Sequence, residues 1–330
     1  MNEKTKILNS EILFIYDAKM CNPNGDPDEE NKPRMDYETF TNLVSDVRLK
    51  RYIRDYLLSK GYEIWVSKVD DEVVDATKRL RILAKKYVEE MKAEIKEIDK
   101  FIKEPPSEFI EWLKEKLIDV RMFGAVMPIK GGEERGGGVN FTGPIQFLWG
   151  YSLHPVEIIP SSSITSTFAG RGEEYGTIGK DWRVYYSLIA FYGIISAKRA
   201  EKTNLTSQDV FLLDNTLIEA IPSEATTRSK IGQTPRLLLR VEYMNDFYIG
   251  DLRRYVKVKP KEGKRIDALR EIYDFYLDVS RLIEILRTIK ENIKRIYLWV
   301  HPELSIDLET LNELKNEFKD KIVSLPHKID

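Results

Sequence analysis

The chain has 330 residues, of which 42% are hydrophobic and 32% are charged, and its formal net charge is −2. This length is enough for a substantial core, either as one elaborated domain or as two. A net charge this small excludes a protein that is basic overall, so any role in binding nucleic acid depends on local basic patches. The single cysteine, Cys21, excludes an internal disulfide, and three scattered histidines offer no zinc-site spacing: His154, His301 and His327.

Hydrophobic patterning argues against a membrane protein. The longest uncharged runs, such as residues 184 to 197, are too short and too rich in tyrosine to span a bilayer. The first six residues, MNEKTK, lack the apolar core of a signal peptide. These features predict an intracellular, cytoplasmic protein with no membrane partner.

The first predicted elements are a strand, a polar loop and a helix. Residues 11 to 18 are apolar, with β-branched and aromatic members, which predicts a buried strand. After a loop at 21 to 36, Ser45 and Asp46 are N-cap candidates for a helix that stops at Gly61. One face of this helix is apolar and predicted to face the core: Leu49, Tyr52, Ile53, Tyr56 and Leu57. The other face is basic: Arg48, Lys50, Arg51 and Arg54.

The middle of the chain alternates between helical and β patterns. Apolar residues at helical spacing from 72 to 104 predict one long amphipathic helix, which two prolines end. A second helix is predicted at 107 to 120, and it leads into β structure with a flexible glycine-rich loop at 130 to 138. Residues 161 to 183, which are rich in hydroxyl side chains and glycine, predict a long hairpin excursion between two strands.

The later elements complete a recognisable order. A strand, a helix and a strand are predicted at 183 to 196, 206 to 221 and 235 to 244. The resulting β-α-β-β-α-β order predicts an α+β, ferredoxin-like arrangement of the RRM type, with insertions after the first helix and between the middle strands. The remainder, 245 to 330, is predicted to add a helix near 266 to 288, a strand at 296 to 300 and a charged C-terminal helix.

The loop CNPNGDPDEENKPRMD, residues 21 to 36, has no apolar side chain between its first cysteine and its methionine, so it either turns the chain or contacts a ligand. Its polar residues alternate as in an EF-hand: Asn22, Asn24, Asp26 and Asp28. Proline nevertheless occupies the positions that need the sharp-turn glycine and the bidentate glutamate, Pro27 and Pro33, which excludes that motif.

Three interpretations of the loop stay open. One is a proline-stiffened turn in which Asn and Asp side chains bond their own backbone. Another is a looser divalent-cation site made by Asp17, Asp26 and Asp36. The third is a phosphate site, because Lys32 and Arg34 flank the start of the basic helix, and exposed amides, helix N-termini and basic side chains together bind phosphate.

A family resemblance extends over about two thirds of the chain. NPNGDPDEENKPRMD followed by NLVSDVRLKRYIRDYL resembles the start of the type I CRISPR-associated Cascade backbone subunit, the "Cas seven" family. The resemblance continues through DVRMFG, GGVNFTGPIQFLWGYS, SITSTF and GTIGKDWRVYY and is weaker in the C-terminal third. The type I-C subgroup shares the NPNGDPD core, but the helix that follows is more similar to type I-B.

This resemblance implies an RRM-like palm, a helical finger-like insertion and a thumb-like β-hairpin. The palm corresponds to 1–59, 139–160 and 184–244, the finger-like insertion to 60–138, and the thumb to 161–183, with 245–330 as a C-terminal α/β extension packed on the palm. Members of the family polymerise head to tail along a CRISPR RNA, and the RNA-guided complex then pairs with a target DNA strand. The implied function is therefore a non-catalytic RNA-binding subunit for antiviral defence, with other Cascade subunits as partners.

The resemblance also implies which residues hold the RNA. Those matching the family's Ser…Lys-Arg helix start and its extension are Ser45, Arg48, Lys50, Arg51 and Arg54. Those matching the opening loop are Asn22, Asn24, Lys32 and Arg34. In the thumb, hydroxyls suit phosphate or sugar and an aromatic suits either a base or the packing of the hairpin: Thr165, Ser166, Thr167 and Phe168. Basic residues that close the thumb and complete the track are Lys180, Arg183, Arg228 and Lys230.

Enzymatic interpretations find less support in the sequence. There is no GxSxG motif and no P-loop, no cofactor is expected, and His154 precedes a proline without an evident nucleophilic partner, which predicts a structural role. Type III relatives cleave RNA with an aspartate in a loop like the one that holds Asp26, but type I backbones bind without cutting, so Asp26 is assigned no catalytic role. The RRM signature aromatics are absent, which favours recognition of the RNA backbone over base stacking on the sheet. The alternative function is a metal-dependent ribonuclease that uses the loop aspartates.

Overall fold

The structure is a computed structural model that describes residues 6–67, 72, 74–94, 97–128, 138–160, 163–165, 178–306 and 308–327. The chain divides into two compact units. Unit 1 consists of the described residues within Met1–Leu8, Arg54–Gln146 and Ile194–Leu213. Unit 2 consists of those within Asn9–Ile53, Phe147–Gly193 and Asp214–Asp330. The units follow other boundaries than the predicted palm and finger.

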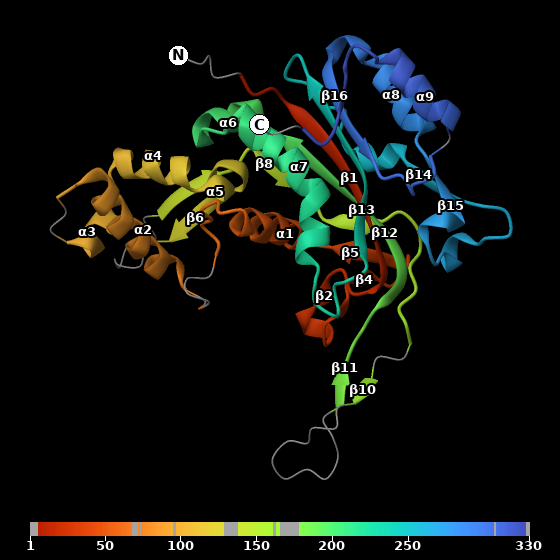
Figure 1. Cartoon of the computed structure of the whole chain (residues 1–330), viewed down its shortest axis with the longest axis horizontal. Coiled ribbons are helices and arrows are strands. Elements are labelled where there is room, and N and C mark those ends of the chain that lie inside the picture. Colours follow the sequence, from red (N-terminus) through yellow and green to blue (C-terminus); the bar gives the residue numbers. More distant parts are fainter. Residues whose placement is uncertain are drawn as a thin grey trace. The chain divides into compact units, whose positions relative to one another are not determined.

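Unit 2 is built on a central, mostly antiparallel sheet with helices, an α+β fold (Figure 1). Its strands are β1 Ser10–Cys21, β4 Met35–Asp36, β5 Thr41–Val44, β9 Gly150–Ser152, β12 Val184–Ile195, β13 Gln233–Tyr243, β16 Ile293–Val300 and β17 Ile322–Ser324. They lie in the order β17-β16-β13-β1-β12-β9-β5-β4. β1 pairs antiparallel with β13, which pairs antiparallel with β16, while β17 joins β16 in parallel.

The other elements of unit 2 are helices and short ribbons. The helices that lie wholly or partly in it are α1 Asp46–Ser59, α7 Ser207–Glu224, α8 Ser280–Thr288 and α9 Leu308–Glu317. The two-stranded ribbons are β2 Gly25–Asp26 with β3 Lys32–Pro33, β10 Ser163–Thr165 with β11 Ile178–Lys180, and β14 Lys257–Pro260 with β15 Phe275–Asp278. Short 3-10 helices are η1 Pro27–Glu29, η2 Leu252–Tyr255, η3 Ile266–Ala268, η4 Ile272–Asp274 and η5 Lys290–Asn292.

Helices cover both faces of the sheet in unit 2. Successive side chains of a strand point to opposite faces. On β13, Leu237 and Leu239 face an apolar space lined by α8 and α9. Arg240, the next residue, points the other way and forms a fully buried ion pair with Asp214 of α7, with a nitrogen–oxygen distance of 2.6 Å. The sheet therefore lies between α7 on one face and α8 with α9 on the other.

Strand β1 is buried on both faces, as a central strand should be. Every residue from Ser10 to Ala18 is buried. Its two carboxylates have hydrogen-bond or ion-pair partners, which offset the cost of their burial. Glu11 accepts from the hydroxyls of Tyr192 and Tyr243 and from two backbone amides, and Asp17 accepts from Tyr186 and lies 2.9 Å from Arg236.

Unit 1 is mainly helical. Its elements are α2 Ala76–Met91, α3 Ile98–Lys103, α4 Ser107–Lys116, α5 Ile118–Phe123, β6 Gly124–Pro128, β7 Gly138–Thr142 and α6 Ala197–Thr203, and β8 Ile145–Phe147 ends at its boundary. Aromatic and aliphatic side chains of α2, α4 and α5 form its core, including Leu83, Tyr87, Phe109 and Trp112. The buried carboxylate of Asp119 accepts hydrogen bonds from the backbone of Trp65 and from Arg54, which fixes the chain that precedes α2.

The predicted single helix at 72 to 104 is wrong, because the structure has two helices there. α2 ends at Met91, and Lys92 adopts a left-handed conformation with φ 51° and donates its N–H to Val88. The ring of Phe101 in α3 stacks on that of Tyr87, with centroids 6.0 Å apart. In one straight helix these residues would lie about 21 Å apart, so the break allows the aromatic core to close.

The predicted helix near 266 to 288 is wrong over its first half. Those residues form η3, η4 and strand β15, and helix α8 begins only at Ser280. The apolar residues 266, 269, 272 and 275 recur every third position, a spacing that 3-10 turns share with one face of an α-helix. In β15, burial then alternates, with Phe275 and Leu277 buried and Tyr276 exposed.

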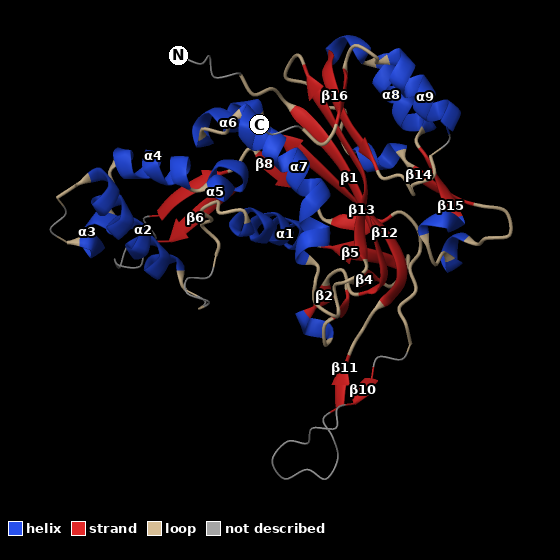
Figure 2. Ribbon diagram, viewed as in Figure 1, coloured by secondary structure: helices blue, strands red, loops and turns tan. Residues whose placement is uncertain are grey.

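Several predicted elements are confirmed (Figure 2). The strands predicted at 11 to 18, 183 to 196, 235 to 244 and 296 to 300 correspond to β1, β12, β13 and β16. The helices predicted after the opening loop and at 206 to 221 correspond to α1 and α7. The apolar stripe of α1 is buried as expected, with Ile53 and Leu57 fully enclosed. The predicted loop at 130 to 138 lies outside the described residues, except for Gly138, which begins β7.

His154 has the structural surroundings that its sequence context predicts. The residue is 4% exposed, and burial lowers the pKa of its imidazole from 6.5 to about 4. Nδ1 lies 2.8 Å from the carbonyl of Pro155, and Nε2 accepts the N–H of Leu188 at 3.2 Å. These contacts fit the neutral tautomer with its proton on Nδ1, because a second proton on Nε2 would face another donor.

We expect His154 to make the fold less stable in acid. Its neutral form is favoured in the folded chain, so this contribution is complete above pH 6.5 and is lost as the pH falls through 4. The loss amounts to about 3 kcal/mol in the free energy of unfolding, and chemical denaturation at pH 7, 5.5 and 4.5 measures it. A His154→Gln variant should lose less stability over this range, and an equal loss in both chains would contradict this role.

Candidate nucleic-acid interface

The opening loop folds as a small ribbon that its own polar side chains hold. β2 pairs with β3, and η1 connects them. Asp26 caps η1 by accepting the N–H of Asp28 and forms an ion pair with Arg34 at 2.9 Å. The hydroxyl of Tyr37 donates to Glu29. Part of the acidic middle of the loop is therefore used to shape the loop itself.

Asn24 attaches this ribbon to the start of helix α1. Its side-chain oxygen accepts both the backbone N–H of Ser45, at 2.8 Å, and the Ser45 hydroxyl, at 3.0 Å. The backbone carbonyl of Asn24 also accepts the N–H of Arg34. Because Ser45 supplies the first carbonyl of the helix, to Arg48 and Leu49, the loop and the helix start form one hydrogen-bonded assembly.

Asn22 attaches the loop to a third segment, residues 226–231. The N–H of Asn22 bonds to the carbonyl of Ser229, and the ammonium of Lys230 donates to the carbonyl of Asn22 at 2.6 Å. Burial, and to a smaller extent the nearby Arg48, lower the pKa of Lys230 from 10.5 to about 8. Lys230 is therefore a partly desolvated cation held against the loop.

Arg183, immediately before β12, binds the same region. Its guanidinium is held by Asp181 at 2.8 Å and donates to the carbonyls of Met20 and Arg228. Arg228 is 65% exposed and lies 3.8 Å from Asp181. Lys180 pairs with Glu30 of the loop, which lowers the pKa of Glu30. Basic side chains that are far apart in the sequence are thus connected by direct contacts in unit 2.

Three cations of this region lie over aromatic rings. Lys32 lies 4.8 Å from the ring centroid of Trp182, Arg34 lies 5.6 Å from that of Trp149, and Arg48 lies 3.9 Å from that of Tyr52. Such stacking orients a guanidinium or ammonium while leaving its charge in place. The basic cluster is defined here as the seven residues Lys32, Arg34, Arg48, Lys180, Arg183, Arg228 and Lys230.

Buried polar atoms of the basic cluster and of the adjacent Trp182 and Asn22 find no hydrogen-bond partner among the described residues. Three are donors: Nε of Arg34, Nε of Arg48 and Nε1 of Trp182. One is an acceptor, Oδ1 of Asn22, in a side chain only 5% exposed. An unsatisfied buried donor costs about 1–3 kcal/mol, so several of them in one place indicate a region prepared for a ligand rich in acceptors.

Other predicted site residues lie elsewhere or are engaged. Lys50 is buried and forms an ion pair with Asp46 at 3.1 Å, whereas Arg51 is exposed on α1. Arg54 belongs to unit 1, where Asp119 binds its guanidinium at 2.9 Å. Thr165 is the last residue of β10, and Ile178 is its partner in β11. The remaining thumb candidates, Ser166, Thr167 and Phe168, lie outside the described residues.

The structure gives the loop aspartates separate partners. Asp17 is bound by Arg236 and Tyr186, Asp26 by Arg34, and Asp36 by Thr39 and the N–H of Glu38. Within the described parts of the chain, no three His, Cys, Asp or Glu side chains are grouped so as to hold a metal ion. The looser divalent site that the sequence left open thus gains no support from the geometry.

Sequence reasoning missed the aromatic partners of the cations. Trp182 lies within the GTIGKDWRVYY motif, and an aromatic residue between charged neighbours is the available signal for it. Tyr52 follows Arg48 by four positions on α1, so the i, i+4 spacing is the local signal for that contact. Trp149 is far from Arg34 in the sequence, and no local signal indicates that these two stack. The long-range pairing that brings 226–231 to Asn22 likewise has no counterpart in local sequence.

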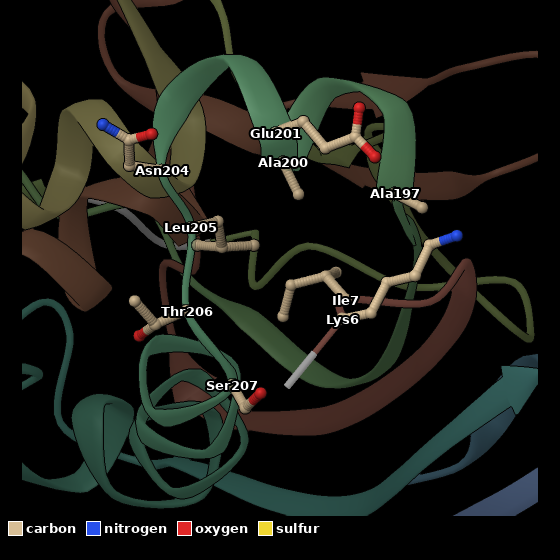
Figure 3. Close-up of a pocket in the computed structure, with 9 residues that line it drawn as sticks. All are labelled: Lys6, Ile7, Ala197, Ala200, Glu201, Asn204, Leu205, Thr206 and Ser207. Atoms are coloured by element: carbon tan, nitrogen blue, oxygen red, sulfur yellow. The ribbon is translucent and has the colours of Figure 1, made fainter. Parts of the chain in front are cut away.

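A separate hollow of about 380 Å³ lies in unit 1 (Figure 3). Ile7, Ala200 and Leu205 supply apolar surface, while Lys6 and Glu201 supply opposite charges at its border. The rest of the lining comes from the two ends of α6, at Ala197 and Asn204, and from the start of α7, at Thr206 and Ser207. None of the predicted site residues lines this hollow.

Comparison with known proteins identifies the family. A sequence model of the family described as "CRISPR-associated protein Cas7" matches residues 8–280. The chain belongs to this family. The CRISPR-associated protein Cas7 of Haloferax volcanii is 30% identical over 340 residues, which cover 98% of this Cas7 family member and 96% of that relative.

One solved structure has the same fold as this Cas7 family member. A chain of a "CRISPR RNA-guided surveillance complex, pre-nicking" superimposes with a TM-score of 0.50 and 15% identity, over 88% of this chain and 91% of that one. A chain of another "CRISPR RNA-guided surveillance complex" gives 0.49 and 12% identity, over 94% and 99%. In the part of the chain that the structure describes, no helix is long and apolar enough to cross a bilayer.

We expect Lys230→Met to stabilise the RNA-free chain at pH 7, by about 1 kcal/mol, because the wild-type cation is partly desolvated. Because the pKa of Lys230 is lower in the folded chain, the folded chain releases its proton first as the pH rises from 8 to 10.5. Over this range the free energy of unfolding of the wild type should therefore rise by up to about 3 kcal/mol relative to the variant. Urea unfolding of both chains at pH 7, 8.5 and 10 measures this difference. A constant difference across these pH values would contradict the burial of the cation.

Proposed function

We propose that this Cas7 family member is a non-catalytic backbone subunit that binds CRISPR RNA in a type I, and within it a type I-B-like, Cascade complex for antiviral defence. The observation that carries the proposal is the basic cluster together with the buried donors on Arg34, Arg48 and the adjacent Trp182, none of which has an acceptor among the described residues. Phosphate and ribose oxygens are the acceptors that such a set fits. Family membership and the CRISPR RNA-guided complexes among its structural neighbours support the same ligand.

The cluster suits recognition of the RNA backbone. Guanidinium, ammonium and backbone amide groups bind phosphates of any sequence, and a guide RNA needs its base edges free for pairing. The exposed cation Arg228 and the partly buried Lys230 extend the cluster along the 226–231 segment. Asn22 offers an acceptor oxygen, which suits a donor such as a ribose 2′-hydroxyl. Arg51 is the further candidate on the exposed side of α1.

An RRM-like palm is the architecture we infer for unit 2. Its strands β13, β1, β12 and β9 are adjacent in that order. In chain order these are the fourth, first, third and second strands, which is the order of a ferredoxin-like sheet. The helical elements of unit 1 support the finger-like insertion, and the antiparallel β10–β11 pair supports a thumb that begins at residue 161. Palm, finger and thumb in the predicted residue ranges are part of this proposal.

The proposed assembly is a head-to-tail filament of copies of this chain along the guide RNA, with other Cascade subunits as further partners. A heterologous interface of this kind repeats without closing, so RNA length sets the number of copies. The bound guide then pairs with a target DNA strand, in the cytoplasm. The ribonuclease alternative is not favoured by any observation, because the aspartates it requires have separate partners.

We expect Arg48→Gln combined with Lys230→Met to weaken RNA binding roughly ten- to hundredfold at low salt and to reduce the salt slope by about 1.4, because two phosphate contacts are lost. Fluorescence anisotropy with two labelled 30-nucleotide RNAs of unrelated sequence measures both quantities. The matched control is Lys294→Gln with Lys315→Gln, two exposed lysines of β16 and α9. Equal weakening by the control, or a loss for one RNA only, would overturn backbone recognition by this cluster.

A cleavage assay separates the two functions. We expect labelled repeat-spacer RNA to stay intact when incubated with the wild-type chain and Mg²⁺, while the bound RNA becomes protected from added ribonuclease. Cleavage that Asp26→Ala abolishes would instead establish the ribonuclease. Denaturing electrophoresis of the RNA over a time course reads out both outcomes.

RNA binding should also depend on pH through Lys230. A bound phosphate favours the charged ammonium, so RNA binding takes up a proton above the free-chain pKa of about 8. Affinity should be constant from pH 6.5 to 7.5 and fall about three- to tenfold by pH 9. Adenine-only RNA avoids titration of the bases, and Lys230→Met should lack this fall. A fall of the same size in the variant would assign the pH dependence to another group.

A further inference from the structure

The β14–β15 ribbon of unit 2 has two chemically different faces. Its register pairs Lys257 with Asp278 and Lys259 with Tyr276. Phe275 and Leu277 point to the other face and are buried, with exposed fractions of 1% and 0%. Residues directly opposite each other in an antiparallel pair share a face. The two pairs Lys257–Asp278 and Lys259–Tyr276 therefore form one outward face.

Lysines dominate this outward face. Lys257 is exposed, and the side chain of Lys259 is 65% exposed. Lys261, just beyond β14, lies on the same face, because its ammonium is 4.8 Å from the ring centroid of Tyr276. The face contains one carboxylate, Asp278, which Lys259 contacts at 2.7 Å. The lysine face is defined here as Lys257, Lys259, Lys261 and Tyr276.

The segment that contains the lysine face has a small positive excess. Residues 251–278, which include both strands of the ribbon, contain eight Lys or Arg and six Asp or Glu, in a chain whose net charge is −2. Arg254, in the preceding η2, is exposed. The apolar side of the ribbon explains its attachment to unit 2, whereas packing does not explain a row of lysines that faces solvent. None of these residues belongs to the basic cluster or to the residues predicted from the sequence.

We propose that the lysine face is a second binding surface for a single strand of nucleic acid, separate from the basic cluster that is proposed to hold the guide. Residues two apart on a strand lie about 6.8 Å from each other, so Lys257 and Lys259 repeat at a distance similar to that of neighbouring phosphates on an extended strand. Lys261 continues the row, and the exposed part of the Tyr276 ring provides a surface for a base. A row of cations beside an aromatic ring is the combination that binds single strands without sequence preference.

The regular spacing favours nucleic acid over an acidic protein segment as the occupant. Phosphates recur at a constant interval along one strand, and alternate residues of a β-strand recur at a constant interval too. Carboxylates of a folded protein surface have no such repeat. The single carboxylate on the face, Asp278, is already occupied by Lys259 and by the N–H of Ser280, and these two contacts lower its pKa to about 2.

The test uses the full chain with Lys257→Gln, Lys259→Gln and Lys261→Gln together. The probe is fluorescently labelled oligo-dT of about 30 nucleotides. The same triple change is also made in the Arg48→Gln, Lys230→Met background, which removes two contacts of the basic cluster. In both backgrounds we expect oligo-dT affinity to fall at least tenfold and the salt slope to fall by about 2, because three phosphate contacts are lost. Urea unfolding of each variant checks that the exposed substitutions leave the fold intact.

The matched control replaces three exposed lysines elsewhere in unit 2, Lys294→Gln, Lys315→Gln and Lys319→Gln, and should leave oligo-dT affinity within twofold of the wild type. An equal loss of oligo-dT affinity in this control would overturn the proposal, because it would show that binding depends only on the net charge of the chain. Unchanged oligo-dT binding by the ribbon variant would also overturn the proposal. If that variant instead altered self-association in sedimentation, the face would be assigned to a second copy of the chain. Failure of the guide-binding proposal is read separately, from RNA binding of the Arg48→Gln, Lys230→Met chain.

Discussion

The central position of strand β1 is the constraint on which the rest of unit 2 depends. It has neighbours on both edges, β13 and β12, and every side chain from Ser10 to Ala18 is buried. Its middle therefore has no access to solvent, and only the end of the strand can serve a ligand. At that end the chain leaves the sheet as the opening loop, and Asn22 and Asn24 tie this loop to the 226–231 segment and to helix α1. The basic cluster exists because these amides bring three distant segments together.

The local pattern of apolar residues is sufficient to predict elements whose buried side chains form one continuous run or one helical stripe. β1, β12 and β13 are continuous apolar runs, and α1 has one apolar stripe, so their existence and type were predicted correctly. Prediction failed where two structures share a period. The apolar residues from 266 to 275 recur every third position across two separate 3-10 turns and the start of β15. The 72 to 104 pattern runs through a helix break that is set by contact between Tyr87 and Phe101. Those breaks depend on tertiary packing, which a sequence window does not contain.

The candidate site shows the same division between local and long-range information. The sequence identified the cations themselves, since charge is a property of the residue. It did not identify which carboxylate neutralises which cation: Arg54 is bound by Asp119, sixty-five positions away, whereas Arg228 keeps most of its side chain in solvent. The acidic part of the opening loop, unexplained from the sequence, has a structural use, because Asp26 and Glu30 pair with Arg34 and Lys180.

The burial of the one cysteine in the sequence has a practical consequence for experiments on this protein. Cys21 is fully enclosed beneath the loop, and burial raises the pKa of its thiol to about 12. Thiolates, not thiols, react with maleimides and disulfide reagents, so the folded chain is in effect inert to them at neutral pH. A cysteine introduced at any exposed position becomes the sole reactive site without removal of the native one. Spin labels, fluorophores and crosslinkers can thus be attached one at a time to an otherwise unaltered chain.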